Sequence, residues 1–108
     1  MATFTGTTGG DTLQGTSGND TIIGLGGEDV LDGFAGDDYV ESLGASGLTD
    51  INGQRGNDTL VGSVPGEGQI HMRGAAGDDL IQMDVTNTSG HQGHHVYGGL
   101  DADTFEIV

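Results

Sequence analysis

The sequence contains no cysteine, a single proline (Pro65), and only two basic residues besides its histidines, Arg55 and Arg73. The absence of cysteine excludes disulfides and is consistent with a secreted protein built without them. The formal net charge is -15, so no basic patch is available to bind nucleic acid or an anionic membrane surface. Hydrophobic residues make up 32% of the chain, including two tyrosines and three phenylalanines, which is too little for an ordinary globular core.

Targeting and catalytic motifs are also missing from the sequence. No N-terminal stretch combines a charged head with an apolar run, so a Sec-type signal is not expected. No apolar segment approaches transmembrane length. Neither H-E-x-x-H nor G-x-S-x-G occurs, and the spacing of an EF-hand loop is absent.

Glycine is abundant instead, at 23 of 108 residues, far above its usual share of about 7%. Low hydrophobicity together with high net charge is normally a signature of disorder. The glycines are placed periodically, however, and this changes the interpretation. From Gly6 to Glu41 the chain repeats every nine residues, as GTTGGDTLQ, GTSGNDTII, GLGGEDVLD and GFAGDDYVE.

Each of these units has glycine at positions one and four, aspartate at position six and an aliphatic residue at position eight. Three further units follow, namely GQRGNDTLV from Gly53, GAAGDDLIQ from Gly74 and GGLDADTFE from Gly98, the last with Asp101 in place of the position-four glycine. All seven position-six residues are aspartates: Asp11, Asp20, Asp29, Asp38, Asp58, Asp79 and Asp103. Because these acids occupy repeat positions rather than a cleft, the chain is not expected to be an enzyme by itself.

The two halves of the nonapeptide predict different structures. Glycines at fixed positions allow positive φ, so G-x-x-G-x-D can form a loop that aims carbonyl and carboxylate oxygens inward. Such oxygens are the ligands that Ca²⁺ prefers. The last three residues alternate as a short strand with one side chain turned inward. A single unit cannot bury that side chain, so the units must stack, two to a turn, around a column of position-eight residues.

The repeat resembles the calcium-binding nonapeptide of the RTX (repeats-in-toxin), hemolysin-type family, whose consensus is G-G-x-G-x-D-x-U-x. This resemblance implies an all-β, right-handed parallel β-roll (a β-solenoid) of about five turns, forming one domain over residues 1–108. Regular repeats would occupy 6–41, 53–61, 74–82 and 98–106, separated by irregular segments at 42–52, 62–73 and 83–97. It further implies secretion through a type I channel, with an uncleaved signal near the C-terminus.

The same resemblance implies about five Ca²⁺ ions held between the loops of successive turns. The implied metal-binding residues are the seven position-six aspartates together with Gly15, Gly18, Gly33, Gly36, Gly53, Gly56, Gly74, Gly77 and Gly98. Electrostatics supports a cation there. Equivalent aspartates would lie about 4.8 Å apart in a parallel coil and would repel by about 3 kcal/mol per pair without a cation between them.

The spacing also predicts that the two edges of the roll are unequal. One edge should receive the loops that begin at Gly15, Gly33, Gly53, Gly74 and Gly98. The other should receive the loops at Gly6 and Gly24 and then the irregular segments, whose growth from 9 to 11, 12 and 15 residues is expected at its turns. We expect four ions along the regular edge. We expect one ion between the Asp11 and Asp29 loops, with Asp50 as a candidate ligand of a second.

Two features leave alternatives open. His91, His94 and His95 form a transition-metal site, a surface contact or an ordinary polar loop, and an enzymatic function would need the metal site. His71 is expected to point outward between inward Ile70 and Met72. In function, a calcium-dependent folding and secretion module competes with an accessory or adhesion module whose irregular edge binds polysaccharide or a cell-surface ligand. The sequence identifies neither a parent protein nor an oligomeric state.

Overall fold

The computed structural model describes residues 2–43, 47–63, 68–84 and 95–107. Within them it contains eleven β-strands and no helix. The strands are β1 (Thr3–Thr5), β2 (Thr12–Gln14), β3 (Thr21–Ile23), β4 (Val30–Asp32), β5 (Tyr39–Leu43), β6 (Gly47–Asn52), β7 (Thr59–Ser63), β8 (Gly68–Ala75), β9 (Leu80–Asp84), β10 (His95–Gly99) and β11 (Thr104–Ile107). In the regular units the strands lie at the ends of the nonapeptides, where β-branched and aromatic residues favour extended backbone.

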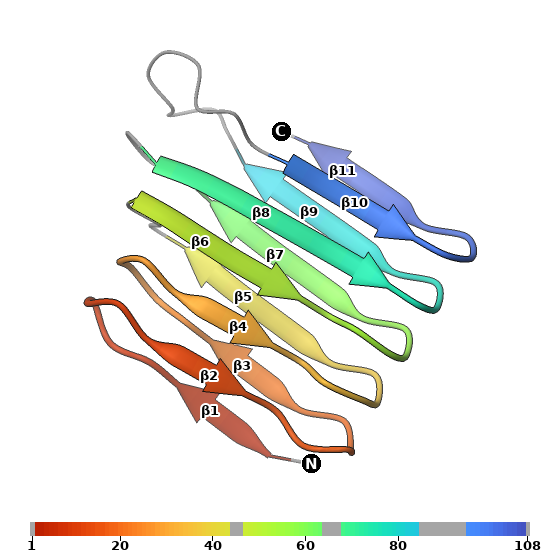
Figure 1. Ribbon diagram of the computed structural model, residues 1–108, viewed down its shortest axis with the longest axis horizontal. Coiled ribbons are helices and arrows are strands. Elements are labelled where there is room, and N and C mark those ends of the chain that lie inside the picture. The colour runs from red at the N-terminus through yellow and green to blue at the C-terminus, as the bar shows by residue number, and fades with distance from the viewer. Residues whose placement is uncertain (1, 44–46, 64–67, 85–94, 108) are drawn as a thin grey trace.

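The strands form two parallel sheets that the chain visits alternately (Figure 1). The six-stranded sheet has the order β1-β3-β5-β7-β9-β11, and the five-stranded sheet has the order β10-β8-β6-β4-β2. Every pairing is parallel and joins strands two apart in the chain. The predicted all-β parallel solenoid is therefore confirmed. The molecule measures 36 × 29 × 15 Å, so it is a slab only two sheets thick.

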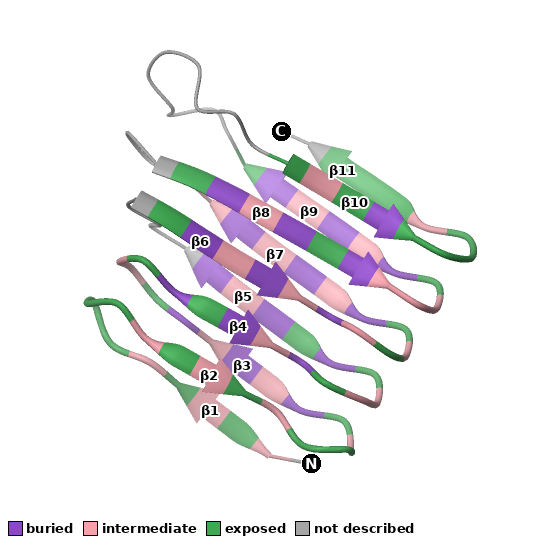
Figure 2. Cartoon of the chain, viewed as in Figure 1, coloured by how far each residue is buried: buried purple, intermediate pink, exposed green. Residues whose placement is uncertain are grey.

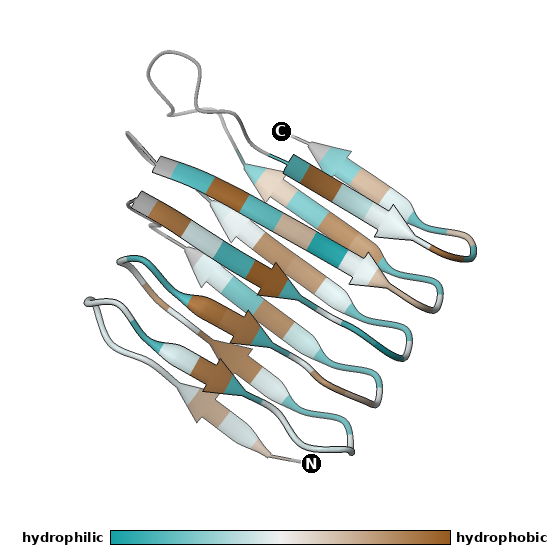
Figure 3. Ribbon diagram, viewed as in Figure 1, coloured by the Kyte–Doolittle hydropathy of each residue, from teal (hydrophilic) through white to brown (hydrophobic). Residues whose placement is uncertain are grey.

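The core is a narrow column of aliphatic side chains between the sheets. Buried residues appear as purple segments that alternate with other colours along the strands in Figure 2, and Figure 3 colours the hydrophobic residues of the same strands brown. The position-eight residues contribute most of it, as predicted. Those with at most 1% exposure are Ile22, Leu31, Val40, Leu60 and Ile81. Phe4, Leu13 and Val96 are partly buried against the ends of this column.

The two edges differ as the spacing predicts. Loops that follow the even-numbered strands stack along the right side of Figure 1 and are called the regular edge below, and the turns on the opposite side are called the irregular edge. Along the chain, the separation of equivalent residues in adjacent turns grows from 18 to 20, 21 and 24 residues. All of the added residues belong to the segments that pass along the irregular edge.

The added residues are not confined to turns, which corrects the expectation that strands keep their length. β1 to β4 have three residues each, whereas β6 has six and β8 has eight. The extensions pair in register, with Ser42 opposite Gly62 and Gly62 opposite Met83. Ile70 and Met83, which lie outside the position-eight column, are buried, so the core widens toward the irregular edge. The described residues form no helix able to span a membrane.

Candidate metal centre

The position-six aspartates join successive turns along the regular edge. The backbone N–H of each aspartate donates to Oδ1 of the aspartate one turn later, at 2.8 Å from Asp20 to Asp38 and from Asp38 to Asp58. The same bond measures 2.9 Å from Asp58 to Asp79 and from Asp79 to Asp103. The structure therefore gathers five predicted ligands into one row, which we call the aspartate row.

The second carboxylate oxygen of the central aspartates has no hydrogen-bond partner. Oδ2 is buried and unpaired among the described residues in Asp38, Asp58 and Asp79. Leaving a buried charged acceptor unpaired costs about 1–3 kcal/mol or more. Carboxylate oxygens are ligands that calcium prefers, so this row fits calcium as part of its donor set.

Glycine at position one keeps space open beside this oxygen. A Cβ added at Gly15 would lie 2.8 Å from Asp20 Oδ2, and one at Gly33 would lie 2.6 Å from Asp38 Oδ2. The same collision recurs in the later loops, between Gly53 and Asp58, Gly74 and Asp79, and Gly98 and Asp103. A side chain at position one would fill the space next to the carboxylate.

Burial makes the central carboxylates hard to ionise in the absence of a cation. Burial first, and then the neighbouring carboxylates Asp38 and Asp79, raise the pKa of Asp58 from 3.8 to about 7. Burial likewise raises the pKa of Asp38 to about 6 and the pKa of Asp79 to about 6. The hydrogen bond from the preceding turn's N–H opposes each shift without cancelling it. Ionising the row without a cation is therefore unfavourable.

The position-four glycines bring neighbouring loops into close backbone contact. φ is +98° at Gly36, +117° at Gly56 and +109° at Gly77, a region that residues with a side chain rarely adopt. A Cβ at Gly36 would lie 2.5 Å from the carbonyl oxygen of Gly18, and Gly56 and Gly77 repeat this collision with Gly36 and Gly56. In the last unit Asp101 takes over position four with φ +74°. Its Oδ2 also accepts the Gly77 N–H at 3.1 Å, so the last loop contacts the preceding loop at position four as the other loops do.

The first turn uses threonine where later loops leave the carboxylate unpaired. The backbone N–H of Thr16 donates to Asp20 Oδ2 at 2.6 Å, and its hydroxyl donates to the same oxygen at 2.9 Å. These bonds, the backbone one first, lower the pKa of Asp20. Thr7 makes the equivalent contacts with Asp11. Position two of the later loops instead takes positive φ, as at Phe34 (+76°). The repeat alone suggested equivalent loops, and the threonines at position two were the available signal that they differ.

A second ladder, at position five, was missed by the sequence analysis. Asp37 N–H donates to Asn19 Oδ1, Asn57 N–H to Asp37 Oδ1 and Asp78 N–H to Asn57 Oδ1, each at 2.8 Å. Here the earlier turn accepts, whereas in the aspartate row the later turn accepts, so each pair of loops is tied in both directions. The signal was the run of Asn and Asp at position five in the units starting at Gly15, Gly33, Gly53 and Gly74.

The acidic row on the irregular edge stops after two members. Asp11 N–H donates to Asp29 Oδ1 at 2.9 Å, and the next turn supplies Thr49, whose hydroxyl accepts the Asp29 N–H at 3.3 Å. The Thr49 hydroxyl itself donates to Gly27 O at 3.1 Å. Asp50 pairs with Val30 on the outer face instead, which contradicts its suggested role as a ligand here. Buried Ile70 follows Thr49 in register, so an apolar contact replaces the acidic position.

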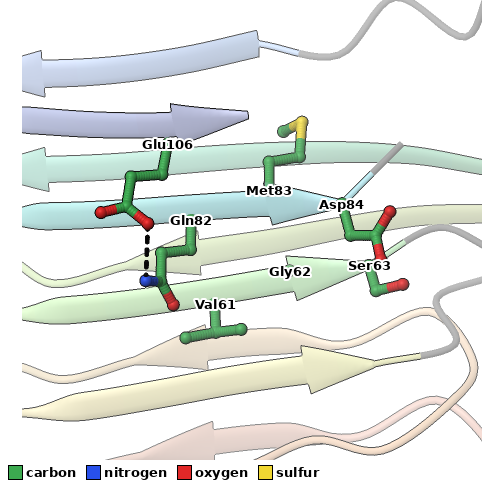
Figure 4. Close-up of a pocket in the computed structure, with 7 residues that line it drawn as sticks. All are labelled: Val61, Gly62, Ser63, Gln82, Met83, Asp84 and Glu106. Atoms are coloured by element: carbon green, nitrogen blue, oxygen red, sulfur yellow. Dashed lines mark hydrogen bonds between the residues drawn. The ribbon is translucent and has the colours of Figure 1, made fainter. Parts of the chain in front are cut away.

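A separate hollow of about 420 Å³ lies on the six-stranded sheet near the irregular edge (Figure 4). It is lined by Val61, Gly62, Ser63, Gln82, Met83, Asp84 and Glu106. Gln82 Nε2 donates to Glu106 Oε2 at 3.0 Å across its floor. It contains no member of the aspartate row and is not part of the candidate metal centre.

Backbone oxygens are needed to complete any cation site in the aspartate row. Among the described residues, no three His, Cys, Asp or Glu side chains converge as a metal-binding group. Calcium accepts roughly 6–8 oxygens, including carbonyls, which the closely stacked loops supply. Of the predicted histidine cluster, only His95 lies in the described residues; His91 and His94 lie outside them.

Comparison with known proteins agrees with this geometry. The family model for the RTX calcium-binding nonapeptide repeat matches in four copies, over residues 5–41 and 43–63, which is more than half of the chain. No curated protein and no solved structure gives a significant match.

Proposed function

Because the chain belongs to the family that carries the RTX calcium-binding nonapeptide repeat, we propose that it is a module whose folding is driven by calcium outside the cell. The observation that carries this proposal is the row of buried, unpaired Oδ2 atoms on Asp38, Asp58 and Asp79. Without a cation these charges oppose folding. With one they stabilise it, since metal binding free energy becomes folding free energy.

The proposed ions lie between adjacent loops. Four would occupy the gaps of the aspartate row, from Asp20 to Asp103, and a fifth would lie between the Asp11 and Asp29 loops. Asp11, Asp29 and the row would supply carboxylates, and the glycine loops would supply carbonyls. The Thr16 contacts already satisfy Asp20, so the gaps between Asp38, Asp58 and Asp79 depend most on calcium.

In this proposal the whole chain, 1–108, acts as one domain of a secreted protein that passes a type I channel unfolded. Calcium-poor cytosol would keep it extended, and extracellular calcium would fold it. The fold and family are those of a structural calcium-binding domain, and any catalytic activity would belong to an attached protein. In the competing polysaccharide-binding role, the irregular segments 42–52, 62–73 and 83–97 would carry the specificity. Residues 44–46, 64–67 and 85–94 of these segments lie outside the described residues.

The test is circular dichroism and small-angle scattering with EGTA and with millimolar calcium. Calcium should produce a β spectrum and a Cα radius of gyration near 12.4 Å. In EGTA an unfolded chain of this length should measure about 33 Å. Magnesium at the same concentration should act poorly, because it demands tight octahedral geometry. A compact β state that persists in excess chelator would overturn the proposal.

A further inference from the structure

The outer face of the five-stranded sheet brings together two histidines that are far apart in the sequence. β8 and β10 pair in parallel with His71 directly opposite His95. Their ring centroids lie 4.6 Å apart with a tilt of 37°. Flanking residues of β8, Ile70 and Met72, are fully buried, so His71 points away from the core as the alternation predicts. The pair lies on the sheet face and includes no residue of the aspartate row.

Each ring is oriented through its Nδ1 atom. His71 Nδ1 lies 3.6 Å from Asp50 Oδ1, and His95 Nδ1 lies 3.0 Å from the Tyr97 hydroxyl. In the tautomer with hydrogen on Nδ1, His95 donates to the Tyr97 hydroxyl, whereas Asp50 faces His71 Nδ1 from beyond hydrogen-bond distance. Both Nε2 atoms then carry a lone pair. Metal-binding histidines are commonly held in this way, by a carboxylate or other oxygen on the second nitrogen.

We propose that His71 and His95 form a two-imidazole site for a borderline transition-metal ion such as Zn²⁺, Cu²⁺ or Ni²⁺, with Asp50 and Tyr97 as positioning residues. Imidazole nitrogen suits these metals, whereas calcium prefers oxygen, so the two kinds of site select different ions. Water would complete the coordination, because the pair offers only two imidazole nitrogens. The net charge of -15 raises the local concentration of any divalent cation.

The experiment is a calorimetric titration of zinc chloride into protein saturated with calcium, whose folding is first verified by circular dichroism. Saturation blocks zinc from the aspartate row. The wild-type chain should bind one zinc ion with a dissociation constant below about 100 µM. His71→Ala and His95→Ala should each weaken binding more than about tenfold, and Asp50→Asn should weaken it by about tenfold.

His91→Ala/His94→Ala is the matched control, because it removes two histidines that precede β10 in the sequence and leaves the proposed pair intact. Its zinc affinity should stay within about threefold of wild type. The proposal is wrong if wild type shows no saturable binding in this range, or if the control loses zinc while His71→Ala retains it. Unchanged calcium midpoints for all variants would show that any lost zinc binding is not lost folding. A failure to fold with calcium would instead contradict the proposed function.

Discussion

Aspartates at the same repeat position differ in what their carboxylates contact. Asp20 receives two bonds from Thr16, and its pKa is lowered. Asp58, two turns later, has a buried unpaired Oδ2, and burial raises its pKa to about 7. The demand for a cation is therefore greatest in the middle of the aspartate row.

Asp58→Asn should separate the two roles of this side chain. The amide can still accept the Asp38 N–H, but it lacks the charge that holds calcium. We expect the calcium midpoint of folding to rise by about tenfold, while the small amount of structure present in EGTA should increase. Titrations followed by circular dichroism measure both effects.

Asp84→Asn is the control for this change, since Asp84 is exposed at the end of β9, outside the aspartate row. Its calcium midpoint should remain at the wild-type value. Equal midpoints for the two variants would refute the assignment of Asp58 as a ligand.

The nonapeptide spacing was enough to place the position-six aspartates in a row, because equal spacing in a parallel coil brings equivalent residues together. It was not enough to reveal the ladder through Asn19, Asp37 and Asn57, because Asn and Asp are also common as simple loop residues. Nor did it reveal the pairing of His71 with His95. That contact depends on the number of residues in the irregular segments, which the repeat does not fix.

The loops of the regular edge are limited by close backbone packing at position four. The added Cβ of Gly56 would collide with the Gly36 carbonyl oxygen, and φ at Gly56 is +117°. At Gly9, the same repeat position in the first loop, a Cβ would meet only Thr7 Oγ1 at 3.7 Å, and φ is not positive. One sequence motif thus has two steric environments.

Gly56→Ala should consequently destabilise the calcium-loaded fold by about 2 kcal/mol or more, through both collision and backbone strain. Gly9→Ala should change stability by less than about 0.5 kcal/mol. Urea unfolding at saturating calcium provides the comparison. Similar losses in the two variants would mean that position four is equally constrained in every loop.

The strands of the regular units could be predicted because an inward-facing hydrophobic residue recurs at position eight of every nine-residue unit. In segment 42–52 the repeat still places Ile51 inward, and the structure confirms this, but the repeat does not identify an acidic ligand. The aspartate of this segment is Asp50, but the residue that enters the position of Asp29 is Thr49. Because Ile51 is buried in the core, its neighbour Asp50 must face outward. The two-residue addition therefore leaves the acidic residue one position away from the inward-facing site.

The whole molecule has a pH dependence set by the central carboxylates. The pKa of Asp58 is about 7 and the pKa values of Asp38 and Asp79 are about 6 in the folded chain, against an ordinary value of 3.8. At pH values between 3.8 and these raised pKa values, the folded state binds more protons than the unfolded state. The calcium-free fold therefore gains stability as pH falls from about 7 toward 4, and loses it as pH rises through the folded pKa values.

We expect EGTA-treated protein to gain β structure when the pH is lowered from 8 to about 4.5. Calcium binding should weaken over the same range, because protons compete for the same carboxylates. Circular dichroism at several pH values, with and without calcium, tests both trends. A calcium-free chain that became less structured on acidification would contradict the raised pKa values.

The thinness of the slab has a thermal consequence. With two sheets across 15 Å and nine buried hydrophobic side chains among the described residues, unfolding exposes little apolar surface. The heat-capacity change should therefore fall below the roughly 12–15 cal/mol/K per residue of ordinary globular proteins, and the curve of stability against temperature should be flat. Differential scanning calorimetry at a series of calcium concentrations would then show a melting temperature governed mainly by the supply of ions.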